Sequence, residues 1–168
     1  MSRGTIIAKV AAGSTLAMAS YVMYDYKTCH PMRKLKGYNV DGAITRFHNT
    51  LVRKHILPTS SFSLKDLSRF DGKSQNLIYF ASDGWIWDVT KADSFQGNSP
   101  YGLWRGKDAT VSLAKMSMDK SDANRTDWEN LSQQDIESLR SWTDYFAEKY
   151  FIKGKLKEYA EHHEGRKS

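Results

Sequence analysis

The sequence predicts an α+β domain that is preceded by a single N-terminal transmembrane helix and an amphipathic connector helix. Three observations predict this: an apolar stretch at 5–24, apolar residues at helical spacing across 40–56, and a hairpin pattern followed by a long helical pattern across 77–150. With 168 residues, 40% of them apolar, the chain can bury one sizeable core. We therefore divide it into an anchor (1–26), a basic connector (27–60), a domain (61–156) and a charged C-terminal tail (157–168).

The N-terminal stretch has nearly the length of a membrane anchor. Residues 5–24 contain no Asp or Glu, and a helix needs about 20 mostly apolar residues to cross a bilayer. Lys9 lies near one end, where its side chain can extend to the interface. Small residues such as Ala12 and Gly13 suit close packing against helices of other subunits. A secretory signal peptide and a mitochondrial presequence are the alternatives, and of the three we favour a retained anchor.

Basic residues are distributed unevenly around this stretch. Lys27, Arg33, Lys34 and Lys36 follow it, whereas only Arg3 precedes it. The positive-inside rule then places the domain on the cytosolic or matrix side of the membrane. The acid-poor N-terminus with early basic residues favours the mitochondrial inner membrane over the endoplasmic reticulum. The basic flank suits anionic membrane lipid, while no recognition motif supports nucleic-acid binding, despite the net charge of +6.

The connector contains an amphipathic helix at about 41–57, which Pro58 ends. Its apolar residues recur at helical spacing: Val40, Ile44, Phe47, Leu51, Val52 and Ile56. Its polar side carries Arg46, His48, Arg53, Lys54 and His55. Two arrangements remain open: the polar side faces headgroups or an acidic partner, or the apolar stripe packs on the chain's own domain.

Two helix starts are recognisable in the domain. Ser63 with Asp66, and Ser132 with Asp135, have the spacing of N-terminal capping residues. The second start opens a long helix with apolar residues at steps of three and four, and Gly154 is its expected stop.

Between these two starts the pattern is that of strands and loops. Residues 77–81 and 85–89 are β-prone, and Ser82-Asp83-Gly84 has the composition of a hairpin turn. A glycine- and proline-containing loop follows, and we expect a short helix at about 109–115.

Four blocks in this order resemble one known family. They are FSLKDLSRFDG at 62–72, IYFASDGWIWDVT at 78–90, FQGNSPYGLWRGKDA at 95–109 and SWTDYFAEKYFIKGKL at 141–156. Over roughly 95 residues the chain resembles the cytochrome b5-like haem/steroid-binding domains of the membrane-associated progesterone receptor family. The resemblance implies a small sheet whose helices form a pocket for a planar hydrophobic ligand, and an N-terminal membrane anchor.

The resemblance also suggests haem as a candidate cofactor. All five histidines lie outside the resembling blocks and the His-Pro-Gly-Gly loop of cytochrome b5 is missing, which argues against a bis-histidine electron carrier. We expect His162 and His163 to be solvated tail residues. In this family a tyrosinate holds the iron, and its motif tyrosine corresponds to Tyr101. A family lysine and tyrosine correspond to Lys149 and Tyr150.

The same region permits a haem-free interpretation. A second family tyrosine aligns with Gln96, so one polar group of the motif differs. Tyr101 would then be a buried turn residue bonded to Lys149, with Trp104 filling the pocket.

Two functions follow from these observations. The first is a nonenzymatic accessory subunit of a membrane complex, for which the mitochondrial respiratory chain is the candidate. The alternative is a tyrosinate-ligated haem-binding or haem-trafficking protein that uses Tyr101, Lys149 and Tyr150. We do not expect an enzyme, because the sequence contains no recognisable nucleophile, phosphate-binding or zinc-ligand motif.

Overall fold

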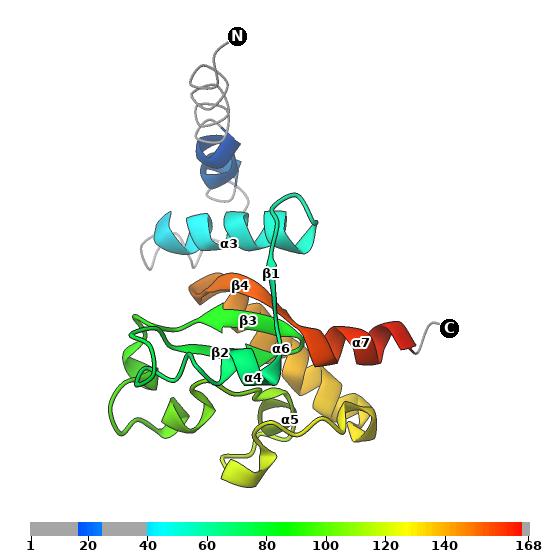
Figure 1. The fold of residues 1–168 in the computed structure, drawn as a ribbon. Helices are drawn as coiled ribbons and strands as arrows, with labels where there is room; N and C mark the ends of the chain where they lie inside the picture. Colours follow the sequence, from blue (N-terminus) through cyan, green and yellow to red (C-terminus); the bar gives the residue numbers. More distant parts are fainter. Residues whose placement is uncertain (1–16, 25–39, 166–168) are drawn as a thin grey trace.

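The computed structural model describes residues 17–24 and 40–165 (Figure 1). Residues 17–24 are helical. The α-helices that follow are α3 (Val40–Arg53), α4 (Leu64–Leu67), α5 (Thr110–Ala114), α6 (Gln133–Lys149) and α7 (Lys157–Gly165). The strands are β1 (Ser60–Phe62), β2 (Tyr79–Ser82), β3 (Trp85–Asp88) and β4 (Phe151–Leu156). Short 3-10 helices are η1 (Asp93–Phe95), η2 (Pro100–Trp104), η3 (Lys120–Asp122) and η4 (Trp128–Asn130). This confirms the α+β class.

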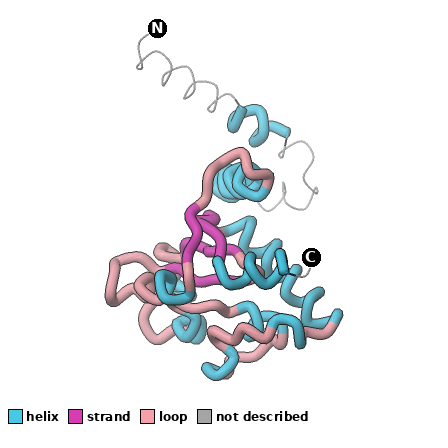
Figure 2. The backbone as a smooth tube through the Cα atoms, turned by 45° about the vertical axis from the view of Figure 1, so that its right-hand side comes forward, coloured by secondary structure: helices cyan, strands magenta, loops and turns pink. Residues whose placement is uncertain are grey.

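The four strands form one small sheet in the order β1-β4-β3-β2, surrounded by helices and loops (Figure 2). β1 runs parallel to β4, and the other neighbours are antiparallel. Because successive side chains of a strand point to opposite faces, the sheet separates two apolar clusters. Phe80 and Trp87 belong to the larger cluster, which α6 covers with Phe146, while Tyr79 and Ile86 belong to the smaller one.

The β2–β3 hairpin was predicted correctly, with a shorter turn than expected. Ser82 pairs with Trp85 inside the ladder, so the loop consists of Asp83 and Gly84 alone. Both have positive φ, 52° and 74°, as a two-residue type I′ turn requires.

The capping predictions at Ser63 and Ser132 are confirmed, but the predicted end of the long helix is wrong. Each serine accepts a hydrogen bond from the amide of the aspartate three residues later, and each aspartate accepts one in return. The second helix, α6, ends at Lys149 rather than at Gly154. Gly154 instead lies in β4, where an added Cβ would stand 2.3 Å from the carbonyl oxygen of Ser60. The lack of a side chain at Gly154 therefore lets β1 pack closely against β4.

The predicted connector helix exists as α3, which is slightly shorter than expected. It ends at Arg53, and His55 follows in the left-handed conformation with φ of 57°. The predicted anchor at 5–24 lies mainly outside the described residues. Among those described, no helix has both the length and the apolar character of a bilayer span.

Residues 157–165, in the predicted charged C-terminal tail, form the helix α7. The His162 ring lies 5.5 Å from Trp128, centroid to centroid, and its side chain is 24% exposed. His162 is therefore packed against the domain, which corrects the expectation that it is solvated.

Candidate functional site

A cavity of about 550 Å³ lies between α6 and the loop that carries η1 and η2. Its size falls within the range of small-molecule and cofactor sites. Most of its wall is aromatic; the lining residues are Ser94, Phe95, Tyr101, Trp104, Ser141, Trp142, Tyr145, Phe146, Lys149 and Tyr150. All three residues singled out in the sequence therefore border one cavity.

The loop that presents Tyr101 is held by local hydrogen bonds. Pro100 opens η2, and its fixed φ suits the first residue of a helix. The Arg105 guanidinium donates to the carbonyl oxygens of Gly102 and Gly97, at 3.1 and 3.0 Å. The Gln96 side-chain amide donates to the carbonyl oxygen of Thr90 at 2.7 Å. Gln96 thus stabilises the loop and does not line the cavity.

Tyr101 packs among aromatic rings but has an unpartnered hydroxyl. Its ring stacks on Trp104, with centroids 5.1 Å apart and planes 9° apart, and it lies 5.7 Å from the Phe95 ring. Within the described residues no hydrogen bond joins the Tyr101 hydroxyl to another group, and the buried Trp104 indole N–H also has no partner there. A buried indole N–H usually has a partner, so Trp104 leaves hydrogen-bonding capacity unused in this wall, and the partly exposed Tyr101 adds a second available group.

Lys149 supplies a positive charge at the cavity edge. Its ammonium donates to the hydroxyl of Tyr145, not to Tyr101, and lies 4.3 Å from the centroid of the Tyr145 ring. This hydrogen bond raises the pKa of Lys149, which keeps the ammonium protonated at neutral pH. The Tyr101–Lys149 hydrogen bond of the haem-free interpretation is therefore not formed.

Tyr150 is half-buried beside Phe95 and Phe146, with ring centroids 6.3 and 5.9 Å away. Burial raises the pKa of its phenol, against a hydrogen bond with the Ser94 side chain that lowers it, so Tyr150 is neutral. The site as a whole combines flat apolar walls, the phenols of Tyr101, Tyr145 and Tyr150, and one cation. These groups can bind a planar apolar molecule that carries an acceptor or a negative charge.

Most of the wall was not predicted from the sequence. Trp142 and Tyr145, the partner of Lys149, both line the cavity and were not among the predicted site residues. Both lie on α6 with Phe146 and Lys149, at steps of three or four residues. That spacing puts side chains on one helix face. It could have shown from the sequence that Trp142 and Tyr145 lie on the same face as Lys149.

The donor set fits haem better than it fits a bare metal ion. Within the described residues no three His, Cys, Asp or Glu side chains cluster to bind a metal. A phenolate is a hard anionic ligand that can hold ferric haem iron, and the unpartnered Tyr101 hydroxyl could serve in this way. Lys149 is close enough to the cavity to pair with a ligand carboxylate.

Comparisons with known proteins agree with this fold. The human "Membrane-associated progesterone receptor component 2" is 40% identical over 99 residues, which cover 56% of this chain and 44% of that protein. "Probable steroid-binding protein 3" of Arabidopsis thaliana is 34% identical, and the match covers 56% of this chain and 96% of that protein. "Cytochrome P450 regulator dap1" of Schizosaccharomyces pombe is 32% identical, with coverages of 54% and 59%.

A solved Arabidopsis thaliana protein, described as having a cytochrome b5-like fold, is 33% identical to the chain with a TM-score of 0.52. That match covers 58% of this chain and 91% of the solved one. No protein-family model matches the sequence. The chain spans about half the length of the first curated relatives, 44% to 45%.

Proposed function

Because the chain belongs to the membrane-associated progesterone receptor family of cytochrome b5-like proteins, we propose that it is a nonenzymatic, membrane-attached binding protein. Its ligand is planar and largely apolar, and it enters the Tyr101 cavity. The observation that carries this proposal is the unpartnered Tyr101 hydroxyl on an aromatic wall. Attachment occurs through residues 1–26 as a single-pass anchor, in keeping with the membrane association in the relatives' names.

Haem is the first candidate ligand. Tyr101 would hold the iron as a phenolate, a ligand type that supports ferric haem. The Lys149 ammonium would pair with a propionate, and Tyr150 would remain neutral and hydrogen-bonded to the ligand or solvent. The fused rings of a steroid, the ligand class named for the plant relatives, would occupy the same flat walls.

Hemin titration of the full chain in mild detergent tests this proposal. We expect a saturable Soret band for the natural chain and its loss in Tyr101→Phe, because the phenylalanine keeps the ring but removes the coordinating oxygen. Tyr79→Phe is the matched control, since Tyr79 is a buried tyrosine of the other apolar cluster. Equal binding by Tyr101→Phe would refute the assignment of the ligand. A steroid that prevents the band from forming would identify a shared cavity.

A second proposal concerns the partner of the protein. One relative is named as a regulator of cytochrome P450, and such a name implies that this relative acts on another protein. We propose that this chain likewise acts as an accessory subunit of a membrane complex, with the mitochondrial inner membrane and its respiratory chain as the favoured setting. Native electrophoresis of solubilised membranes tests it: migration in a large complex is expected, and migration only as a free monomer would contradict it.

A further inference from the structure

Helix α3 turns two chemically different faces in opposite directions. With 3.6 residues per turn, positions 42, 45, 49 and 52 fall on one side and positions 40, 44, 47 and 51 fall on the other. Gly42, Thr45, Asn49 and Val52, which form the first group, are all buried. The second group forms the outward stripe, which consists of Val40, Ile44, Phe47 and Leu51 and remains partly exposed. The buried face thus combines the polar Thr45 and Asn49 with Val52 and small residues, whereas the outward stripe is entirely apolar.

Asn49 fixes this orientation. Its side-chain amide donates to the carbonyl oxygens of Ala147 and Tyr150, at 2.9 and 2.8 Å. Its side-chain oxygen accepts from the backbone N–H of Ile152 at 2.9 Å. The residue is 2% exposed. Rotating α3 to bury the stripe would leave the buried Ile152 N–H unpaired, at about 1–3 kcal/mol, and would break the two bonds to Ala147 and Tyr150. The stripe is therefore not the domain-facing side.

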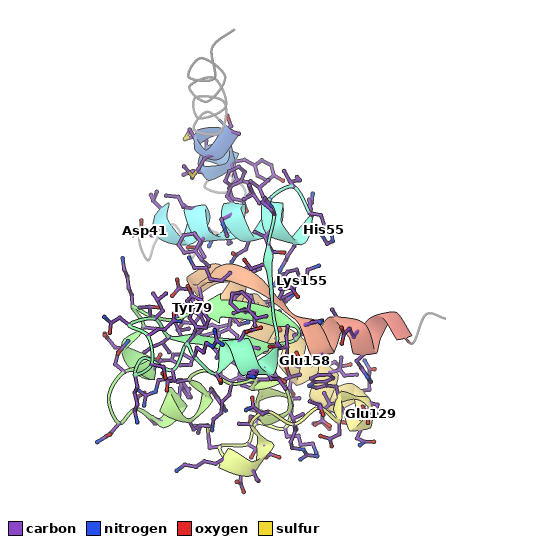
Figure 3. The ribbon with its side chains drawn as sticks, viewed as in Figure 1. Asp41, His55, Tyr79, Glu129, Lys155 and Glu158 are labelled. Carbon is purple, nitrogen blue, oxygen red and sulfur yellow. The ribbon has the colours of Figure 1, made fainter. Side chains whose placement is uncertain are left out.

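The outward stripe faces the N-terminal helix instead. The rings of Tyr21 and Phe47 lie 5.0 Å apart, centroid to centroid. Figures 1 and 2 both show α3 lying crosswise between helix 17–24 and the sheet. In Figure 3, Asp41 lies near the start of α3 and His55 just beyond its end, and side chains fill the space between α3 and helix 17–24. Helix 17–24 covers only part of the stripe, because Val40 is still 49% exposed.

The surroundings of the stripe match a bilayer surface. Residues 1–16, which precede helix 17–24, contain no acidic residue. Residues 25–39, which lead into α3, carry four Lys or Arg and a single acidic residue, Asp25. The exposed Lys54, which follows α3 on the side of the stripe, adds a long cationic side chain that can reach anionic headgroups. Arg46 and Arg53 instead face α6, where they border a cavity with Asp144 and Glu148. An apolar face bordered by basic residues is the pattern of helices that lie in a membrane interface.

We propose that the outward stripe of α3 lies in the headgroup region of an anionic bilayer, with helix 17–24 leading into the membrane above it. α3 is then the platform that fixes the height and tilt of the domain. Because α6 and β4 are tied to α3 through Asn49, the Tyr101 cavity is held at a set orientation to the membrane. This inference rests on the proposed membrane attachment and is more specific than it.

The test uses the full chain with its only cysteine removed by Cys29→Ser. An environment-sensitive NBD label is placed on Val40→Cys, in the outward stripe. The matched control carries the label on Met116→Cys, which is 73% exposed and follows α5, on the side of the domain away from α3 (Figure 1). Each protein is reconstituted with vesicles of phosphatidylcholine and phosphatidylserine, some of which contain doxyl-labelled lipid whose quencher lies about 5–10 Å below the headgroups.

We expect both proteins to float with the vesicles, and doxyl lipid to quench the label at position 40 but not at position 116. Flotation without quenching at position 40 would overturn this inference and leave membrane attachment intact. Equal quenching at both positions would overturn the proposed orientation of α3. Failure to float would refute the attachment itself, so the two proposals fail with different results.

Discussion

Replacement of Asn49 by alanine should destabilise the domain by several kcal/mol. The substitution removes three hydrogen bonds of 2.8–2.9 Å that join α3 to α6 and β4. Each contributes about 1 kcal/mol net, and an unpaired buried N–H, here that of Ile152, costs about 1–3 kcal/mol. We therefore expect a loss of about 3–5 kcal/mol, a large fraction of the 5–15 kcal/mol that is usual for a domain.

Urea unfolding, followed by tryptophan fluorescence, measures this loss as a lower midpoint with an unchanged slope. Thr50→Ala is the matched control, because the Thr50 hydroxyl bonds only to the carbonyl oxygen of Arg46 within α3; it should change stability by less than about 0.5 kcal/mol. A loss below about 1 kcal/mol for Asn49→Ala would refute the argument that buried polar bonds fix α3. Haem affinity should also fall in Asn49→Ala, since two of its partners flank Lys149.

Three further predictions follow. Burial raises the pKa of Asp108 from 3.8 to about 7, so the folded state binds its proton more tightly; the resulting stability, about 4 kcal/mol, is fully present below pH 3.8 and lost as the pH rises through about 7. The unfolding free energy of the natural chain should therefore fall over this range relative to that of Asp108→Asn. Gly154→Ala should cost about 1–3 kcal/mol in urea unfolding, because its Cβ would meet the Ser60 carbonyl oxygen. Ser132→Ala should cost about 1 kcal/mol in the same assay, because Asp135 loses its capping partner.

Each of these has a contradicting result. Parallel pH profiles for the natural chain and Asp108→Asn would show that Asp108 is not the titrating group. Unchanged midpoints for Gly154→Ala would mean that β1 can move away from β4. Ser132→Thr retains the accepting oxygen and serves as the control for the cap, so equal losses for threonine and alanine would refute the capping argument.

Local signals in the sequence predicted much of the fold. The capping boxes at Ser63 and Ser132 depend on residues three positions apart, and the hairpin turn depends on Asp83 and Gly84. Such patterns involve few residues and carry a direct physical mechanism. The Tyr101, Lys149 and Tyr150 positions came from the family resemblance, and all three border the cavity.

Features that depend on distant contacts could not be predicted in this way. Gly154 looks like a helix stop in sequence, and only the approach of Ser60 from 94 positions away makes it a strand residue. The orientation of α3 depends on Asn49 reaching the backbone of residues 147–152. Periodicity left open whether the apolar stripe packs on the domain, and the three hydrogen bonds of a polar residue, Asn49, decide the orientation.

The most direct test of the central claim is amide chemical-shift mapping of the full, isotope-labelled chain in detergent micelles. Gallium(III) protoporphyrin serves as a diamagnetic stand-in for ferric haem. We predict that the shifts concentrate at residues that line the Tyr101 cavity, on η1, η2 and the last turns of α6, and that Tyr101→Phe abolishes them. Shifts confined to α3 or α7, or shifts unchanged in Tyr101→Phe, would contradict the account.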